Sequence, residues 1–295
     1  MASITLKRGT TRRTRQLVLD AFFAWLLFAG TLVASLVLAV LLLEIFQTGW
    51  DRLAADPVDF LTRFVSRIPQ RAGIKAALVG SIYLMGLVAL ISFPIGLGAA
   101  LYLEELAPRG RLANFVEANI ANLAGVPSVV YGILGLGVFV RFAQMGPSLL
   151  AGALTLSVMS LPVIIIAARE AIRAVPSSIR LGAYALGATK LQAMWTQVLP
   201  AALPGTLTGA ILALSRAIGE TAPLLVIGAA VSIFSVPQGV GDQFSALPLL
   251  IFNWTGRPQP AFAEAAAAAS IVLLAVLLAM NAVAIFLRNR YATRW

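Results

Sequence analysis

Long runs without a single charged residue restrict this chain to very few folds. Its 295 residues are 60% hydrophobic and only 12% charged, with a mean hydropathy of +0.91, which is too apolar for a soluble protein of this length. Each run exceeds the roughly 20 residues that a helix needs to cross the hydrocarbon core of a bilayer. The runs cover residues 21–43, 76–103, 118–140, 142–168 and 265–287. The sequence therefore predicts an all-α, polytopic membrane protein.

A sixth apolar stretch, residues 205–233, differs from the others because Arg216 and Glu220 lie near its middle. A charged side chain at the centre of a bilayer costs about 2.5 to 3.5 kcal/mol on insertion scales, and such residues usually mark the path of a charged substrate. Because the two residues are four positions apart, they can neutralise each other on one face of a helix. The sequence thus predicts six transmembrane helices, one of which carries an ion pair.

Basic residues cluster at both ends of the chain, and basic segments tend to stay in the cytoplasm. An even number of spans puts both termini on one side, so we expect both to be cytoplasmic. The first outer loop is also basic, but the inner side carries more positive charge. The formal charge of +10 follows from this topology and does not indicate nucleic-acid binding. The terminal residues are Lys7, Arg8, Arg12, Arg13, Arg15, Arg288, Arg290 and Arg294, and those of the outer loop are Arg52, Arg63, Arg67, Arg71 and Lys75.

The spans divide the chain into segments. These are a cytoplasmic basic N-terminus (1–18), a first transmembrane helix (19–46), an outer loop (47–72), a core of five spans (73–288) that includes a cytoplasmic loop (169–204), and a cytoplasmic C-terminus (289–295). In the outer loop, Asp56 can cap a helix that starts at Pro57 and has Asp59 in its first turn. Apolar residues continue at helical spacing to Ile68, which predicts an amphipathic helix on the membrane surface. The alternative is a docking surface for an external partner.

Histidine and cysteine are both absent, which excludes disulfides, Cys/His metal sites and a histidine proton relay. The 12 acidic residues are dispersed through the chain, and no Ser/His/Asp or Cys/His nucleophile set can be formed. We therefore expect no catalytic residue, no metal site and no cofactor on this chain. The predicted role is not enzymatic.

A proline interrupts the third run. Pro127 removes a helix hydrogen bond, so this span is expected to kink or break, and nearby glycines permit close helix contacts. A broken helix in a membrane needs protein or a water-lined cavity around its free backbone groups. Pro127, Ser128 and Tyr131 are therefore candidates either for lining a pathway or for tight packing.

The cytoplasmic loop 169–204 is predicted to hold two short helices. Ser177 or Ser178 can cap the first one, and Gly187 can end it. Its expected apolar side consists of Ile179, Ala183 and Leu186. The second helix carries Leu191, Met194, Trp195, Val198 and Leu199 at helical spacing, before Pro200 and Pro204 lead into the fifth span. Such a pair of helices could lie on the bilayer or serve as a socket for a cytoplasmic partner.

The same loop resembles the EAA loop of bacterial ABC import permeases, which in that family is the coupling helix that docks into the ATPase subunit. The resemblance rests on Ala183, Gly187, Leu199 and Pro200. The loop departs from the motif at three positions. Leu181 stands where the family's Glu usually is, Gly182 replaces the first Ala, and Gln197 replaces an aliphatic residue. Leu181 cannot make the salt bridge of the motif's glutamate.

Residues 216–223 read Arg-Ala-Ile-Gly-Glu-Thr-Ala-Pro and closely resemble the PstA family, the A-type permease subunits of bacterial phosphate ABC importers. Residues 59–62, 102–105 and 125–132 also resemble that family. The companion PstC family has a similar Arg and Gly-Glu-Thr element but usually differs after Thr. Ala222 and Pro223 therefore favour the A type.

The resemblance implies the type I ABC importer (MetI-like) permease fold in a multi-pass protein of the bacterial inner membrane. Besides the lipid bilayer it implies three kinds of partner: a second, PstC-like permease, two PstB-like ATPase subunits, and a PstS-like phosphate-binding protein outside. ATP and its Mg²⁺ would bind the ATPase, and this chain has no G-x-x-x-x-G-K-[ST] phosphate loop of its own. ATP binding would pull on the loop around Gly187 and turn the paired permeases from inward-facing to outward-facing.

Arg216 is the candidate anion site. Its guanidinium would bind phosphate transiently, Glu220 would hold and compete for it, and Thr221 would lie beside them in the translocation pathway. The structural alternative is a permanent ion pair that only makes the span insertable. Two other function classes are a proton-coupled secondary transporter, in which Glu220 would carry the proton, and an anion channel lined by Arg216.

Overall fold

The computed structural model of the protein describes residues 7–108 and 110–291, and within them every regular element is helical. Parts of the predicted terminal segments 1–18 and 289–295, including Arg294, lie outside the described residues. The α-helices are α1 (Lys7–Ala55), α2 (Pro57–Thr62), α3 (Lys75–Leu101), α4 (Arg111–Ala124), α5 (Ser128–Gly135), α6 (Leu149–Arg173), α7 (Ser177–Ala185), α8 (Lys190–Ala193), α9 (Leu199–Ala217), α10 (Ala222–Val226), α11 (Leu247–Thr255) and α12 (Pro260–Tyr291). There is also one short 3₁₀-helix, η1 (Pro69–Arg71), and there are π-helical segments η2 (Tyr102–Leu106), η3 (Leu136–Phe142) and η4 (Met194–Val198).

Among the described residues, five helical stretches are long and apolar enough to cross a membrane. They are α1, α3 with η2, α6, the continuous stretch from α8 to α9, and α12. The predicted number of six is reached if α4 is counted with α5 and η3 as one broken span, in which the chain turns by 104°. The break lies between Ala124 and Ser128 and contains Pro127, as the sequence predicts.

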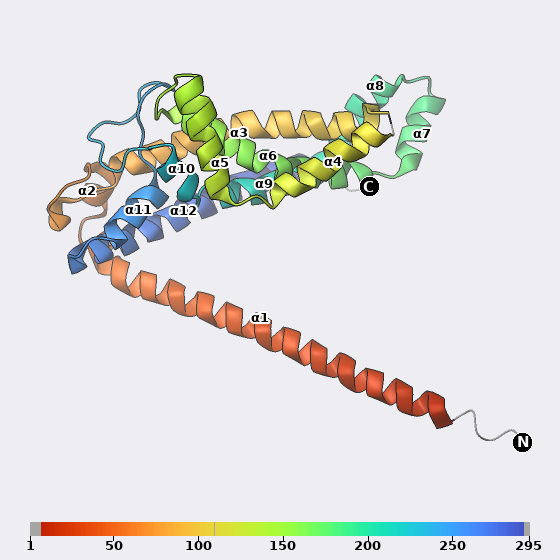
Figure 1. The fold of residues 1–295 in the computed structure, drawn as a ribbon, viewed down its shortest axis with the longest axis horizontal. Coiled ribbons are helices and arrows are strands. Elements are labelled where there is room, and N and C mark those ends of the chain that lie inside the picture. The colour runs from red at the N-terminus through yellow and green to blue at the C-terminus, as the bar shows by residue number, and fades with distance from the viewer. Residues whose placement is uncertain (1–6, 109, 292–295) are drawn as a thin grey trace, which may run out of the picture.

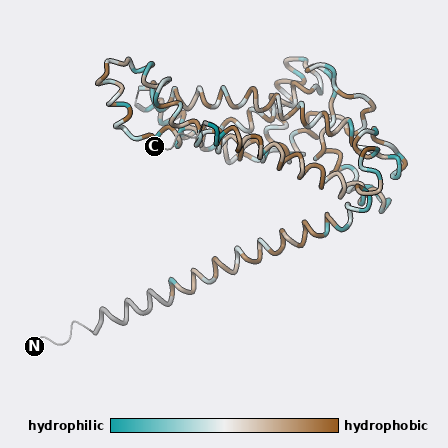
Figure 2. The backbone as a smooth tube through the Cα atoms, turned by 180° about the vertical axis from the view of Figure 1, so that it is seen from behind, coloured by the Kyte–Doolittle hydropathy of each residue, from teal (hydrophilic) through white to brown (hydrophobic). Residues whose placement is uncertain are grey.

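Four long helices, α3, α6, α9 and α12, lie side by side and form the body of the molecule (Figure 1). Helices α7 and α8 lie at one end of this body, called here the α7 end, and α2 and α11 lie at the other, called the α2 end. Polar segments gather at both ends, whereas the shafts between them are apolar (Figure 2). This pattern is that of a bundle whose middle lies in lipid.

Helix α6 and helix α1 stand in opposite environments. In the most apolar stretch of α6, 67% of the residues are buried, whereas in that of α1 none are. Helix α1 contacts α12 near the α2 end and then diverges from the body (Figure 1). Such an apolar helix is stable only with lipid or another protein around it.

Three apolar clusters hold the body together. The first, in the centre, includes Leu84, Leu156 and Phe244. The second, at the α2 end, packs the large side chains Phe60, Trp254 and Phe262. The third lies at the α7 end and consists of Ala100, Leu101, Ile165, Ala168, Ile172, Val175, Met194, Val198 and Ala202. The third cluster joins α3 and α6 to the start of the long helix that contains α9.

The fifth span differs from the prediction. The sequence predicts one helix over residues 205–233 with Arg216 and Glu220 near its middle, but the helix begins at Lys190 and ends at Ala217. Residues 218–221 form a break, and only the short α10 follows. The reason is Pro223, which lacks an N–H and whose ring would clash with the carbonyl four residues earlier in a continuous helix.

The predicted outer segment is also different in detail. Helix α1 runs through the predicted boundary at residue 46 and ends at Ala55. Helix α2 begins as predicted, with the Asp56 side chain accepting a hydrogen bond from the backbone N–H of Asp59. It ends at Thr62 and does not continue to Ile68, because the backbone N–H of Lys75 bonds back to the carbonyl of Arg63. Helix α2 buries Phe60 against the protein, so the prediction of a longer helix on the membrane surface is wrong.

Candidate functional site

Two helix breaks meet in the middle of the molecule. One separates α4 from α5 at Pro127, and the other separates α9 from α10 at residues 218–221. Helices α5 and α10 pack closely against each other. A Cβ atom at Gly132 would lie 2.8 Å from the Cα of Pro223, so only glycine allows this approach. The two interrupted helices are thus held together just beyond their breaks.

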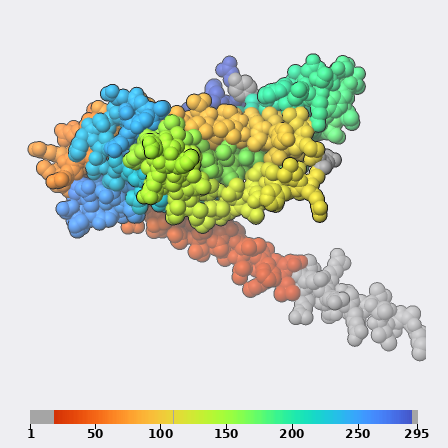
Figure 3. All heavy atoms as spheres, turned by 45° about the horizontal axis from the view of Figure 1, so that its top comes forward, coloured from red at the N-terminus to blue at the C-terminus, as the bar shows by residue number. Residues whose placement is uncertain are grey.

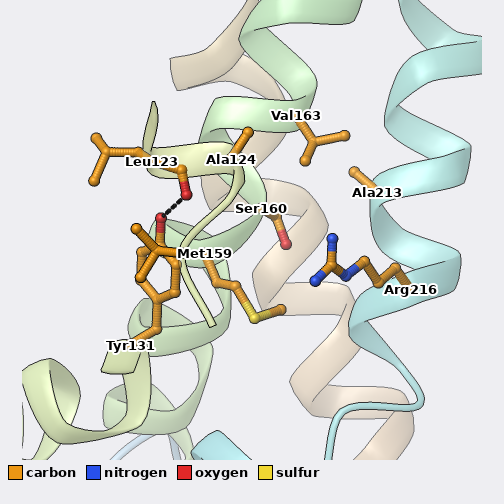
Figure 4. Close-up of a pocket in the computed structure, with 9 residues that line it drawn as sticks. Leu123, Ala124, Tyr131, Met159, Ser160, Val163, Ala213 and Arg216 are labelled. Atoms are coloured by element: carbon orange, nitrogen blue, oxygen red, sulfur yellow. Dashed lines mark hydrogen bonds between the residues drawn. The ribbon is translucent and has the colours of Figure 1, made fainter. Parts of the chain in front are cut away.

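A small recess lies beside the breaks, between α4, α5, α6 and α9 (Figure 4). It is small, with an enclosed volume of about 10 Å³ that would hold about one water molecule, and it is partly open to the surroundings. Arg216 is the one charged residue among those that line it, and its guanidinium points toward Ser160 and Met159 (Figure 4). The lining residues are Leu123, Ala124, Val126, Tyr131, Met159, Ser160, Val163, Ala213 and Arg216.

Arg216 is held by a single, long contact. Its Nε donates a hydrogen bond of 3.3 Å to Oε1 of Glu220, and the Nη atoms make no hydrogen bond within the described part of the chain. The Arg216 side chain is 56% exposed, whereas that of Glu220 is only 17% exposed. Because a guanidinium has five N–H donors, most of its hydrogen-bonding capacity is directed at the recess and not at Glu220.

Tyr131 bridges one of the helix breaks. Its hydroxyl donates a hydrogen bond of 2.8 Å to the carbonyl of Leu123, near the end of α4 (Figure 4). The ring is buried, whereas Leu123 is exposed, so the bond is shielded from solvent on one side only. This contact fixes the angle between α4 and α5 and thereby the shape of the recess.

The predicted pathway residues do not all line the recess. Arg216 and Tyr131 do, and Glu220 is connected to it through Arg216. Pro127 is exposed at the break, and Ser128 is the first residue of α5. Thr221 precedes α10 and makes no side-chain cap. None of these last three is among the lining residues.

Sequence reasoning missed the contribution of α6. Met159 and Ser160 line the recess, and the buried Ser160 hydroxyl donates to the carbonyl of Leu156 at 2.8 Å. A signal was present, because Ser157 and Ser160 interrupt an otherwise apolar run. Hydroxyl groups within a membrane helix usually face protein or a polar cavity.

The predicted coupling loop forms a separate lobe at the α7 end (Figure 3). Helix α7 ends in a Schellman motif, since the N–H of Gly187 bonds to the carbonyl of Tyr184 and that of Ala188 to the carbonyl of Ala183. Gly187 has φ +85°, which favours glycine, and so the predicted helix end is confirmed. The predicted serine cap is wrong, because Pro176 occupies the cap position and no side chain caps the helix.

The loop exposes many apolar side chains. Leu186, predicted to share a face with Ile179 and Ala183, is 91% exposed, while Ile179 and Ala183 are half-buried. Leu199 and Pro200 stand at the start of α9, within the continuous helix and away from the exposed turn at Gly187. The large exposed apolar residues of the lobe are Leu181, Tyr184, Leu186, Leu191 and Trp195. Together they form a surface suited to a protein partner.

Acidic side chains within residues 7–108 and 110–291 do not gather in groups of three or more that could hold a metal ion. The ionisable residues of the body form ion pairs instead. Near the recess there is one pair, and at the α7 end there are several.

Comparisons with known proteins agree with this arrangement. Residues 92–294 match the family model described as "Binding-protein-dependent transport system inner membrane component". The chain is 32% identical to "Phosphate transport system permease protein PstA 1" of Mycobacterium tuberculosis over 94% of this chain and 90% of that one. It is 37% identical to "Probable ABC transporter permease protein YqgI" of Bacillus subtilis over 56% of each chain.

Solved ABC transporters share the fold at low sequence identity. A bacterial alginate ABC transporter in complex with its pentasaccharide-bound periplasmic protein matches with a TM-score of 0.64 and 18% identity, over 92% of this chain and 96% of that one. The methionine transporter MetNI, in an inward-facing conformation, matches with a TM-score of 0.60 and 18% identity, over 75% of this chain and 98% of that one. These matches confirm the predicted type I importer (MetI-like) permease fold. Together with the family match and the PstA relatives, they show that the chain belongs to the family of binding-protein-dependent inner-membrane permeases and is of the PstA type.

Proposed function

We propose that this chain is a membrane-spanning subunit of an ATP-driven importer and that its substrate is inorganic phosphate. The observation that carries the proposal is the recess beside the two helix breaks, where Arg216 supplies the single positive charge. Phosphate transport is also named in the full-length relatives of this chain.

The chemistry of Arg216 suits an oxyanion. A guanidinium binds phosphate through two parallel N–H···O bonds, and the Nη atoms of Arg216 are available for them. Glu220 stays within 3.3 Å and competes for the same cation. A transport site must release what it binds, and this competition limits the affinity. Pairing in the absence of substrate also lowers the cost of keeping the charge in an apolar body.

Energy for transport comes from a separate ATPase, because this sequence has no phosphate-binding loop for ATP. The exposed apolar lobe at the α7 end is the surface on which one of two PstB-like subunits would dock, and the other would dock on the PstC-like permease. In this proposal the α7 end and both termini face the cytoplasm. A PstS-like protein would deliver phosphate at the α2 end. A PstC-like permease would complete the pathway and cover apolar surface that is exposed in the single chain.

The test is uptake of radiolabelled phosphate by liposomes that contain the complete complex, with ATP inside. We expect Arg216→Gln to lower uptake by about ten- to hundredfold, since a charge-assisted hydrogen bond contributes about 1.5 to 3 kcal/mol. Arg141→Gln, which removes an exposed arginine of η3, is the matched control and should leave uptake unchanged. Normal uptake by an assembled Arg216→Gln complex would contradict the proposed site. Uptake that depends on a proton gradient and not on ATP would favour a secondary transporter.

A further inference from the structure

Two adjacent glutamates at the end of α3 bind different helices. Glu104 and Glu105 lie in η2, the short helix that continues α3. Glu104 accepts hydrogen bonds from Arg169 and Arg173 of α6, whereas Glu105 accepts from Arg180 of α7. The end of α3 is therefore a junction between the body of the molecule and the exposed lobe.

All three nitrogens of the Arg180 guanidinium donate hydrogen bonds. Its Nε and Nη2 donate to Oε1 of Glu105 at 2.9 and 2.7 Å. Nη2 also donates to the carbonyl of Ile172 at 2.9 Å, and Nη1 donates to that of Val175 at 2.7 Å. Ile172 lies in the last turn of α6 and Val175 directly follows the helix cap, in the region where a cation is favourable and helix carbonyls lack partners. One guanidinium thus joins α3, α6 and α7.

Besides this pair, α7 contacts the body through Ile179, which packs against the apolar cluster of the α7 end, and through the neighbouring η4. Helix α7 has no buried residue, and its apolar side chains Leu181 and Tyr184 are exposed. Glu105, in contrast, is only 8% exposed in its side chain, beside the apolar cluster of the α7 end. An ion pair that is shielded from solvent and fixed by further hydrogen bonds is rigid. Without it, α7 would keep the half-buried contact of Ile179, its contacts with η4 and α8, and its chain connections, but it would lose its ion pair with the end of α3.

We propose that the Glu105–Arg180 pair is the coupling link of this permease: it passes displacement of α7 to α3 and α6. The inference rests on the proposed function, since it assumes that an ATPase acts on α7. Helix α6 includes Pro162 but stays helical from Ile172 to Met159 and Ser160, which line the recess. A displacement of α7 that is passed to α6 therefore reaches the substrate site. The glutamate of the EAA motif is replaced by Leu181, and the adjacent Arg180 makes its ion pair toward the body instead.

The experiment measures ATP hydrolysis and phosphate uptake in the same liposomes containing the complete complex. We expect Arg180→Gln and Glu105→Gln to retain ATP hydrolysis and to lower the phosphate taken up per ATP by about tenfold, within the usual range of coupling between two sites. Arg180→Lys keeps the charge and should recover part of the loss. Arg173→Gln is the matched control, because Arg173 is exposed at the same end and its ion pairs do not involve α7. The Arg173→Gln complex should take up as much phosphate per ATP as the unmodified complex.

A covalent cross-link in place of the ion pair distinguishes a role in coupling from a role in folding. The chain has no cysteine, so Glu105→Cys with Arg180→Cys places the only two thiols of this subunit at the link. A short, reducible bifunctional thiol reagent should restore uptake per ATP, and reduction should abolish it again. The proposal is overturned if the glutamine variants keep the normal ratio, or if the cross-linked variant assembles and hydrolyses ATP but stays uncoupled. Failure of the unmodified complex to take up phosphate with ATP would instead contradict the proposed function.

Discussion

The ion pair at the recess and the ion pairs at the α7 end use the same chemical groups in opposite ways. At the recess, Arg216 contacts Glu220 through one bond of 3.3 Å, and its side chain is largely exposed. At the α7 end, Arg169 lies 2.8 Å from Glu104 and 2.9 Å from Glu117, with only 9% of its side chain exposed. Arg216 therefore has N–H donors left for a ligand, whereas Arg169 has few.

The difference distinguishes an ion pair that can bind a ligand from ion pairs that hold helices together. A loosely paired cation can exchange one anionic partner for another at little cost, which a transport site requires. A buried cation with several short bonds loses much more when one partner is removed, because the remaining charge stays uncompensated. In this molecule, loose pairing occurs where helices are broken, and tight pairing occurs where the end of α3 meets α6 and α7.

The largest expected effect is at the α7 end. Glu104→Ala would leave the buried Arg169 with Glu117 alone, and we expect the free energy of unfolding of the complex to fall by about 3 to 5 kcal/mol. The measurement is thermal melting of the purified complex in detergent. Glu170→Ala, which removes an exposed partner of Arg173, is the control and should cost less than about 1 kcal/mol. Equal losses in the two variants would show that burial does not distinguish these pairs.

An intermediate effect is expected at the helix break. Tyr131→Phe removes the hydroxyl that binds the carbonyl of Leu123 and should destabilise the protein by about 0.5 to 1.5 kcal/mol, the net contribution of one hydrogen bond, because that carbonyl still accepts the backbone N–H of Val126. Hydrogen exchange of the backbone around Pro127 should increase, because the angle between α4 and α5 is no longer fixed. Tyr83→Phe, at an exposed position of α3, serves as the control. Unchanged exchange in Tyr131→Phe would mean that packing alone maintains the break.

The smallest effect on stability is expected at the recess. Glu220→Gln should change the free energy of unfolding by less than about 1 kcal/mol, since the pair is long and half-exposed. Phosphate uptake should nevertheless change, because Arg216 loses its competitor and releases the anion more slowly. Melting and uptake are measured on the same preparation. A large drop in melting temperature would show that this pair, too, is mainly structural.

Local features of the sequence predicted a large part of this structure. The apolar runs predicted the long helices, because partition of a helix into a bilayer depends on its own composition. Asp56 and Gly187 correctly indicated a helix start and a helix end, since caps and Schellman turns involve neighbouring residues. Arg216 and Glu220 also form the predicted pair, because they are close in the chain.

Features that depend on distant residues were not predictable in this way. The break after Ala217 is a different case, because its signal, Pro223, is local and was outweighed by the continuous apolar run in the prediction. Glu104 and Arg169 are 65 residues apart, and Glu105 and Arg180 are 75 apart, so their spacing carries no information about contact. Met159 and Ser160 line the recess only because α6 packs against α5 and α9.

The sequence by itself determined that this protein is a helical membrane protein with an ion pair in its apolar body, because hydrophobicity and helix signals act over a few turns of chain, and its motifs indicated the permease family. The tertiary structure alone decided which charges hold helices together and which one faces an open recess. That distinction depends on burial and on the number of partners around each charge, and both are set by helices that lie far apart in the sequence.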